Sequence, residues 1–369
     1  MHKLAYLLPP ITLFIHYYIS TEGGTYHHVD YQAYVIAFVV LEAIVGVAHW
    51  IARRAGMDTE FLSGFVTEVK HYREWTERVE YTETVGSGKN ARQVRRVRYV
   101  NHPEYWEWVL NTGHVENIGR DVYWQLVYLW NTGLLHFDTY HTNCVAGGGG
   151  ELCRWDGEEQ HIQTQTYPSP YDNPLDRSNS IFRYREISKT EARELGLYDY
   201  PAIHNYEQQP IVGLNVATEG DQRAFQLLNA LLGRQSQVHF FVLIYEASKG
   251  LAIAEQQRAY WHGGNKNEFT ICLGVEMGSS PILKWCNAFS WMDEPEMEYA
   301  LENWARDHEG QPLVLLDFCS WLRENIHLWQ RKEWKDFKYI PNPMQWWQLL
   351  IVYAIAIIAC VICFMVMQN

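Results

Sequence analysis

The stretch Leu349–Met367, LLIVYAIAIIACVICFMVM, contains no charged residue, and its only polar side chains are Tyr353 and two cysteines. Nineteen residues of α-helix are about 28 Å long, close to the thickness of the hydrocarbon core of a bilayer. Trp346 and Trp347 precede the stretch, and tryptophan favours the membrane interface. We therefore expect residues 331–369 to form a basic linker and a C-terminal transmembrane helix. The basic residues of the linker are Arg331, Lys332, Lys335 and Lys338.

Two further apolar segments, over residues 4–19 and 31–52, lie near the amino terminus. The first is interrupted by Pro9 and Pro10 and is not followed by a small-x-small cleavage site. We interpret it as a retained, kinked anchor rather than a signal peptide, with full spanning of the bilayer left open. Residues 1–54 are therefore expected to form a transmembrane helical hairpin.

The charges that flank these two segments predict their orientation. Lys3 precedes the first segment, and Arg53 and Arg54 follow the second, whereas the linker over residues 20–30 contains no Lys or Arg. By the positive-inside rule, the amino terminus and the large middle of the chain lie in the cytoplasm. The carboxyl terminus then lies outside the cell (inner) membrane.

Glu42 is an ionisable residue near the middle of the second segment. Such a group costs at least a few kcal/mol in the bilayer and normally faces a partner or water. Counted from the cytoplasmic flanks, His16 and Glu42 lie at depths that agree within about 5 Å. We hypothesise that they pair and lock the hairpin. The alternatives are that Glu42 contacts another subunit, is protonated, or contributes to a proton or ion path.

Residues 55–216 are predicted to form a β-rich region that begins with a long hairpin over residues 61–100. Apolar residues from Phe65 to Val85 fall on odd numbers, the period of a half-buried strand. A turn over 86–90 follows, and the chain then returns. The helical spacing of apolar residues after Pro103 predicts helix over residues 103–130, with a turn at 111–117 and the helix resuming at 122.

The formal net charge of the 369-residue chain is −13, which argues against nucleic acid as a partner. The densest basic run, Arg92–Arg98, returns beside a strand rich in Glu, and opposite charges across such a ladder stabilise it. The glycines at 147–150 lack the Lys and Ser or Thr of a phosphate-binding loop. We therefore expect no nucleic-acid partner and no cofactor.

The region from 134 to 166 contains residues of the types that bind metals, but their spacing matches no compact metal site, so we expect no metal. Cys144 and Cys153 flank the four glycines and are either free thiols or a pair across a hairpin. The ligand-type residues are His136, Asp138, His141, Cys144, Cys153 and His161.

From residue 217 to 330 the pattern becomes regular. Helices are predicted from Glu219 and over 251–261, and continuous apolar strands over 238–245 and 269–275. A further strand over 282–291 and two helices follow. Strands that alternate with helices predict a layered α/β sheet, and the whole chain is therefore expected to be an α+β membrane protein.

The stretch Trp261–Phe269, WHGGNKNEF, resembles a motif of the TPM domain, a module of a thylakoid-lumen repair protein and of many bacterial membrane-associated proteins. The resemblance covers residues 217–307 and implies the TPM fold, with Glu268 in place of the usual glycine. The layout, with Tyr260–Phe269 (YWHGGNKNEF) and Ser178–Phe182 (SNSIF), also resembles a group of bacterial and phage membrane proteins, from which no activity is carried over. We carry over no catalytic residue.

Two functions are compatible with this pattern. The first is a membrane scaffold that self-associates in the membrane plane, and it rests on the two anchored ends and on 16 Trp, 24 Tyr and 14 Phe, residues typical of interfaces. The alternative is a membrane-bound, phosphatase-like hydrolase that uses Asn265, Lys266 and Glu268. Membrane lipids, further copies of the chain and a protein partner are the expected partners.

Overall fold

The computed structural model describes residues 2–22, 31–85, 92–173, 175, 184–333, 337 and 344–368. The turn at 86–90, the SNSIF stretch at 178–182, and Lys335 and Lys338 lie outside these residues. Contacts divide the chain into two compact units. The first contains residues 1–60, 170–183 and 333–369, and the second contains residues 61–169 and 184–332.

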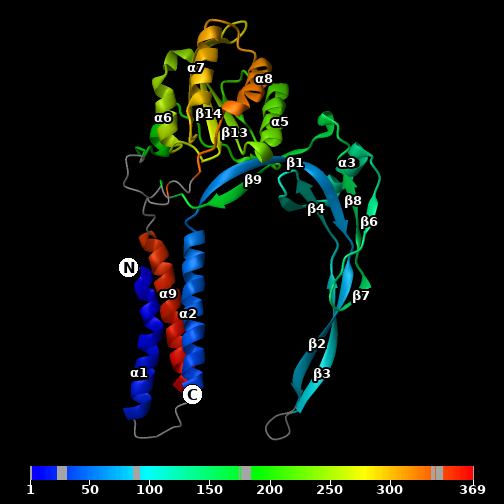
Figure 1. Cartoon of the computed structure of the whole chain (residues 1–369), viewed down its shortest axis with the longest axis vertical. Coiled ribbons are helices and arrows are strands. Elements are labelled where there is room, and N and C mark those ends of the chain that lie inside the picture. Colours follow the sequence, from blue (N-terminus) through cyan, green and yellow to red (C-terminus); the bar gives the residue numbers. More distant parts are fainter. Residues whose placement is uncertain are drawn as a thin grey trace. The chain divides into compact units, whose positions relative to one another are not determined.

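The helical part of the first unit contains two apolar helices long enough to cross a membrane, over Gln32–Arg54 and Trp346–Val366. A shorter apolar helix begins with a 3-10 segment, and its two prolines lie in the first turn of the α-helix that follows, where proline is tolerated. Figure 1 shows the helices side by side. They are η1 (His2–Leu7), α1 (Leu8–Glu22), α2 (Tyr31–Arg54) and α9 (Trp346–Gln368).

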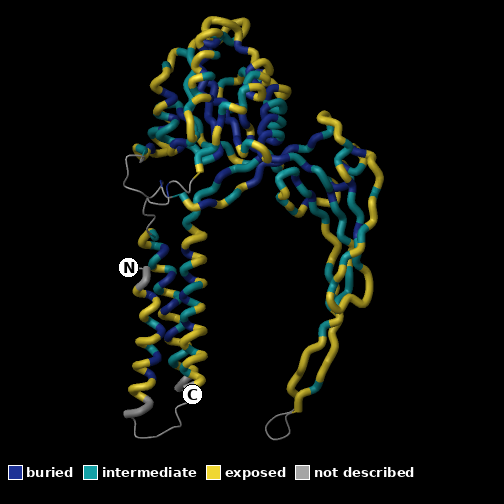
Figure 2. Tube along the Cα trace, in the orientation of Figure 1, coloured by how far each residue is buried: buried dark blue, intermediate teal, exposed yellow. Residues whose placement is uncertain are grey.

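Small side chains allow these helices to pack closely. Ala5, Ala52 and Ala356 are fully buried in one cluster of the bundle. Large apolar residues such as Val39 and Ile358 point outward and are exposed, as the yellow positions along the helices in Figure 2 show. A bundle with small residues inside and large apolar residues outside is typical of helices in lipid.

The second unit contains a six-stranded sheet in the order β5-β4-β1-β8-β6, with β9 paired to β1. Helix α3 (Arg120–Trp130) packs Tyr123, Leu126 and Trp130 on this sheet. The strands are β1 (Asp58–Tyr72), β4 (Tyr105–Leu110), β5 (Val115–Ile118), β6 (Leu135–Phe137), β8 (Gly150–Arg154) and β9 (Thr164–Tyr171).

The predicted helix over residues 103–130 is therefore wrong in its first half, which forms strands β4 and β5. The aromatic residues there also satisfy a period of two, because Trp106, Trp108 and Leu110 face the core side and Trp108 and Leu110 are buried. A run of six residues is too short to separate the two periods.

A second, three-stranded sheet has the order β3-β2-β7. Its strands β2 (Trp75–Val85) and β3 (Arg92–His102) pair antiparallel along their whole length, which confirms the predicted return of the chain. The predicted first strand is broken, however: residues 58–72 form β1 in the other sheet. Strand β7 (Cys144–Gly147) pairs only with the first three residues of β2.

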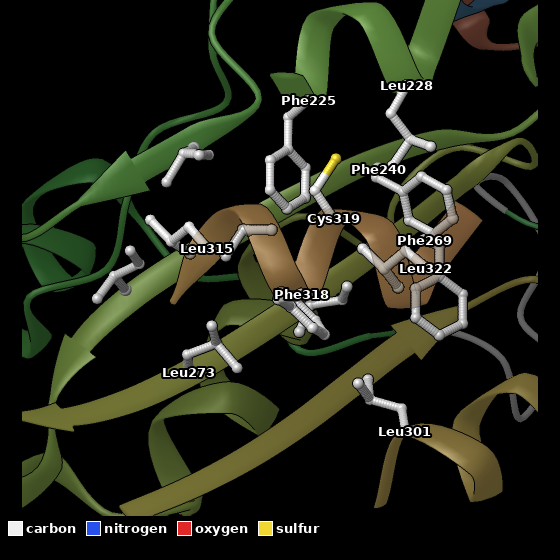
Figure 3. Packing of buried hydrophobic residues seen from close by; sticks show 14 of the residues in the cluster. Phe225, Leu228, Phe240, Phe269, Leu273, Leu301, Leu315, Phe318, Cys319 and Leu322 are labelled. Atoms are coloured by element: carbon white, nitrogen blue, oxygen red, sulfur yellow. The ribbon is translucent and has the colours of Figure 1, made fainter. Parts of the chain in front are cut away.

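The α/β part is a four-stranded sheet in the order β12-β13-β14-β15, in which β15 alone runs antiparallel to its neighbour. Helices α5, α7 and α8 cover one face, where Phe225, Phe240, Phe269 and Phe318 form the core seen in Figure 3. Helices α4 and α6 cover the other face. The strands are β12 (Ile211–Gly213), β13 (His239–Glu246), β14 (Glu268–Glu276) and β15 (Ile282–Ser290); the helices are α4 (Lys189–Leu195), α5 (Glu219–Gln235), α6 (Ala252–Tyr260), α7 (Glu296–His308) and α8 (Leu315–Asn325).

The remaining described elements are short connections. They are the strands β10 (Ile203–His204) and β11 (Glu207–Gln208) and the 3-10 turns η3 (Glu159–His161), η4 (Ala247–Lys249) and η5 (Ile326–Leu328). The predicted strands and helices from residue 219 onward are confirmed, with boundaries shifted by a few residues.

Candidate functional site

The predicted membrane pair is the first candidate. His16 is buried in α1, and its Nδ1 lies 2.7 Å from the hydroxyl of Tyr34 in the first turn of α2. The imidazole also packs edge-on against Phe364 of α9, with ring centroids 5.2 Å apart. His16 therefore joins all three helices of the bundle.

Glu42 is not part of this contact. His16 and Glu42 both lie in the described part of the bundle, and the structure shows no hydrogen bond or ion pair between them. Eight residues separate Glu42 from Tyr34 along α2, which corresponds to about 12 Å. The six residues of η1 rise about 2.0 Å each instead of 1.5 Å, which moves His16 only about 3 Å further toward the α1–α2 turn and accounts for a small part of this separation.

The predicted loop before β14 has an unusual backbone. His262, Gly263 and Gly264 all have positive φ, at 52°, 83° and 77°. A Cβ added to Gly263 would lie 2.7 Å from the hydroxyl of Tyr184 and 3.0 Å from the indole nitrogen of Trp291, so the position requires glycine. The two glycines are thus explained by a tight, packed turn.

The carboxylate of Glu268 holds this turn together. It accepts hydrogen bonds from the backbone N–H of Asn265 at 2.8 Å and from the Asn265 side-chain amide at 2.7 Å. The hydroxyl of Tyr200 donates a third bond to it. Burial and the adjacent carboxylate raise the pKa of Tyr200 well above its usual value, so the phenol stays protonated as the donor.

These contacts make Glu268 a structural residue of the loop. It is buried, and both its oxygens accept bonds from its own chain, while Lys266 is half-buried in the same turn. The loop also leads into the amino end of β14, whereas ligand sites of open α/β sheets lie beyond the carboxyl ends of the strands. The structure thus brings the predicted residues Asn265, Lys266 and Glu268 together, in an arrangement that supports the fold.

A second polar cluster joins the six-stranded sheet to the α/β sheet. The hydroxyl of Ser63 in β1 lies 3.0 Å from Nδ1 of His239 in β13 and 3.0 Å from the hydroxyl of Thr166 in β9. All three side chains are buried. Sequence reasoning missed this cluster because Ser63 and His239 are 176 positions apart, and neither belongs to a motif.

The cluster continues through β9 toward α5. The Thr166 hydroxyl donates to Glu207 at 3.4 Å, and Arg223 of α5 donates to the Thr164 hydroxyl at 2.8 Å. Desolvation raises the pKa of the Glu207 carboxyl to about 7, against weaker opposing effects of Thr164 and Arg223. We call this set, Ser63, Thr164, Thr166, Glu207, Arg223 and His239, the polar seam.

A serine beside a histidine also occurs in hydrolases, but the electrostatics of the seam do not suit that chemistry. Complete burial lowers the pKa of His239 to about 3, which leaves it a very weak base at neutral pH. The second ring nitrogen of His239 is buried without a hydrogen-bond partner in the described structure, so no acid orients the ring. The seam is therefore better suited to holding two sheets together than to activating a nucleophile.

The cysteines and metal-type residues were the remaining candidates. Cys144 is an exposed free thiol on β7, and Cys153 is a buried free thiol on β8 that lies 3.2 Å from the hydroxyl of Thr132. The alternative of a disulfide between them is therefore wrong. Within the described ranges, no three His, Cys, Asp or Glu residues gather as metal ligands would.

Comparisons of the chain with protein-family models, with curated proteins and with solved structures find no match. The site must therefore be interpreted from its own geometry.

Proposed function

We propose that this protein is an integral membrane scaffold that self-associates in the membrane plane and carries a large cytoplasmic body. One contact carries the proposed topology: the side-chain amide of Gln348, at the start of α9, donates a 2.6 Å hydrogen bond to the carbonyl of Ala52 near the end of α2. The contact is fully buried. It fixes the point where the chain leaves the bundle beside the point where it returns.

This contact supports one location for the body. Residues between Arg54 and Trp346 leave and re-enter the bundle at the same end, so the body lies on one side of the membrane. Arg53 and Arg54 lie at that end, and the positive-inside rule assigns it to the cytoplasm. We accordingly propose the cell (inner) membrane as the location, with the amino terminus inside and the carboxyl terminus outside.

The exposed aromatic residues of the body support a role in assembly. Four tyrosines in the described part of the body are between 59% and 94% exposed: Tyr99, Tyr128, Tyr140 and Tyr299. Because tyrosine is enriched at protein interfaces, these side chains are suited to contact a partner. The partners we propose are membrane lipids, further copies of this chain and a protein partner, with no nucleic acid.

We also propose a TPM-like fold for the α/β part. The order of helix α5, strand β13, helix α6, glycine loop and strand β14 supports it, as does the WHGGNKNEF stretch. We likewise propose that the chain is related to the group of bacterial and phage membrane proteins that its layout resembles.

The proposed scaffold function is tested by extracting the protein from membranes and measuring the mass of the solubilised particle. Membranes from cells that produce the full chain are washed with alkaline carbonate, and the protein is then solubilised in detergent and measured by size-exclusion chromatography with light scattering. We expect resistance to the wash and one uniform oligomer. Release by carbonate, or a monomer across the whole concentration range, would contradict the proposal.

A phosphatase-like hydrolase based on the glycine loop is the second candidate, favoured by a buried carboxylate beside a tyrosine and an asparagine. It predicts that Glu268→Gln abolishes turnover of a generic phosphoester while the protein stays folded. The scaffold predicts no turnover in the wild type, and lower thermal stability in the variant because the Tyr200 and Asn265 bonds weaken. Phosphoester assays and melting curves of both proteins separate the two.

A further inference from the structure

Strands β2 and β3 form a two-stranded ribbon that is exposed on both faces. Each strand has eleven residues, and they pair from Trp75 with His102 to Val85 with Arg92. Neither strand contains a buried residue, and Figure 2 shows this extension in yellow and teal. Tyr99 is 67% exposed, and Tyr81 and Val97 are each 42% exposed.

Both long edges of the ribbon are open in the described structure. Strand β7 covers only residues 75–77 of β2, so the outer edge of β2 from Val79 to Val85 has no strand partner there, and β3 pairs with β2 alone. A two-stranded hairpin is only marginally stable in water, and an open edge is a template for another strand. Beyond its contact with β7, the described ribbon therefore has no strand partner within its own unit.

The two edges carry opposite charges. Strand β3 contributes four arginines, and the open stretch of β2, Val79–Val85, contributes two glutamates and no basic residue. Across the ribbon, Arg96 forms an ion pair with Glu83, so these side chains can already pair across a ladder. The charged residues are Arg92, Arg95, Arg96 and Arg98 on β3 and Glu77, Arg78, Glu80 and Glu83 on β2.

We propose that β3 of one copy pairs with the open edge of β2 in the next copy, so that the ribbons join into one intermolecular sheet. The inference rests on the proposed self-association and names the surface that performs it. Joining two β3 edges would place arginines opposite arginines, and joining two β2 edges would place glutamates opposite glutamates, which destabilises a ladder. Only the unlike edges match in charge.

The geometry of this contact has a consequence for the assembly. A contact between two different edges is heterologous, so each copy offers one edge and receives another. Such contacts close into a ring when the rotation permits and otherwise continue as a chain. A second copy of this protein is therefore the occupant of each open edge.

Charge reversal on full-length protein in detergent tests the pairing. One variant combines Arg95→Glu with Arg96→Glu on β3, a second combines Glu80→Arg with Glu83→Arg on β2, and a third carries all four changes. We expect each of the first two to shift the light-scattering mass from oligomer to monomer. In the third variant the two edges again carry opposite charges, and residues 96 and 83 can form an ion pair with the charges exchanged. We therefore expect the oligomer to return.

A matched control reverses charge outside the ribbon. Arg234 in α5 and Arg306 in α7 are exposed, and Arg234→Glu with Arg306→Glu changes the net charge as much as the β3 variant does. We expect this control to keep the wild-type mass. Dissociation of the control, or failure of the four-fold variant to reassemble, would overturn charge matching at the ribbon.

Cysteine cross-linking tests which edges meet. Two differently tagged copies are used, and both carry Cys144→Ser to remove the exposed native thiol. One copy also carries Thr82→Cys on β2, and the other carries Val97→Cys on β3; both positions are exposed. A short bismaleimide added to co-assembled protein should link the unlike copies. Links mainly between two Val97→Cys copies would overturn the pairing of unlike edges.

The outcomes separate this inference from the proposed function. A wild-type protein that is monomeric in membranes and in detergent overturns both. A wild-type oligomer whose mass is unchanged in the β3 and β2 variants leaves the scaffold in place and overturns the ribbon contact.

Discussion

The β13–β14 pair and the β2–β3 ribbon are both built from two long adjacent strands, but their surroundings are opposite. In β13, seven of eight residues are buried, and in β14, eight of nine are buried, because helices cover both faces of the sheet. In the ribbon no residue is buried. The apolar run FFVLIY of β13 is buried by helices of the same chain. The charged ribbon has no such cover, and we propose that a second copy of the chain pairs with it.

The largest expected difference between these regions comes from truncating an aromatic residue in each. Phe240→Ala removes a fully buried ring between β13 and the covering helices, and we expect a loss of about 3–5 kcal/mol in the free energy of unfolding. Tyr99→Ala on the ribbon should change it by less than about 0.5 kcal/mol. Urea unfolding of the detergent-solubilised protein, at one fixed protein concentration and followed by tryptophan fluorescence, measures both; equal losses would contradict the comparison.

The polar seam should make the buried region sensitive to acid. The pKa of His239 is lowered to about 3 from an ordinary 6.5, so between these values the unfolded chain binds a proton that the folded chain does not. Stability therefore falls as pH falls through this window, by about 2 kcal/mol between pH 6.5 and 4.5. Unfolding at several pH values should show this loss in the wild type relative to His239→Asn.

Glu207 supplies the matched contrast for the pH experiment. Its pKa is raised to about 7 from 4.5, so the folded chain keeps a proton that the unfolded chain loses, and stability falls as pH rises from 4.5 to 7. Compared with Glu207→Gln, the wild type should lose stability in this direction, opposite to the His239 effect. If the stability difference between wild type and variant changed with pH in the same direction for Glu207→Gln and His239→Asn, the two side chains would not be buried as described.

A smaller effect is expected where β1 contacts α5. A Cβ added to Gly233 would lie 1.8 Å from the backbone oxygen of Ser63, so Gly233→Ala must move one of two backbone segments. We expect a loss of about 1–3 kcal/mol. Gly220→Ala, on an open face of the same helix, should be neutral or stabilising by up to about 1 kcal/mol. The same unfolding assay applies, and similar values for both variants would refute the close contact.

The parts of the fold that the sequence predicts well are those in which a local pattern and the tertiary contacts agree. The apolar runs of β13 and β14 are long and bounded by glycine turns, and ahead of α4 the Ser188 side chain accepts a bond from the backbone N–H of Glu191, as serine commonly does at a helix start. The apolar helices α2 and α9 follow from length alone.

The parts that it does not predict depend on partners far along the chain. Strand β4 has too few residues for its period to be unique, and the Ser63–His239 contact joins positions without a local signal. The contact of His16 with Tyr34 depends on how three helices pack, since Phe364 of α9 lies against the same imidazole. Glu268 was recognised as unusual, but its structural role required the positions of Tyr200 and Asn265.

The central claim is that the bundle of α1, α2 and α9 crosses the membrane and holds the body on the cytoplasmic side. Cys144 is an exposed native thiol of that body, and a membrane-impermeant maleimide reports which side it faces. We predict that Cys144 is labelled in sealed inside-out vesicles and not in right-side-out vesicles, with Cys144→Ser and detergent-denatured protein as controls. Labelling in sealed right-side-out vesicles would contradict the account.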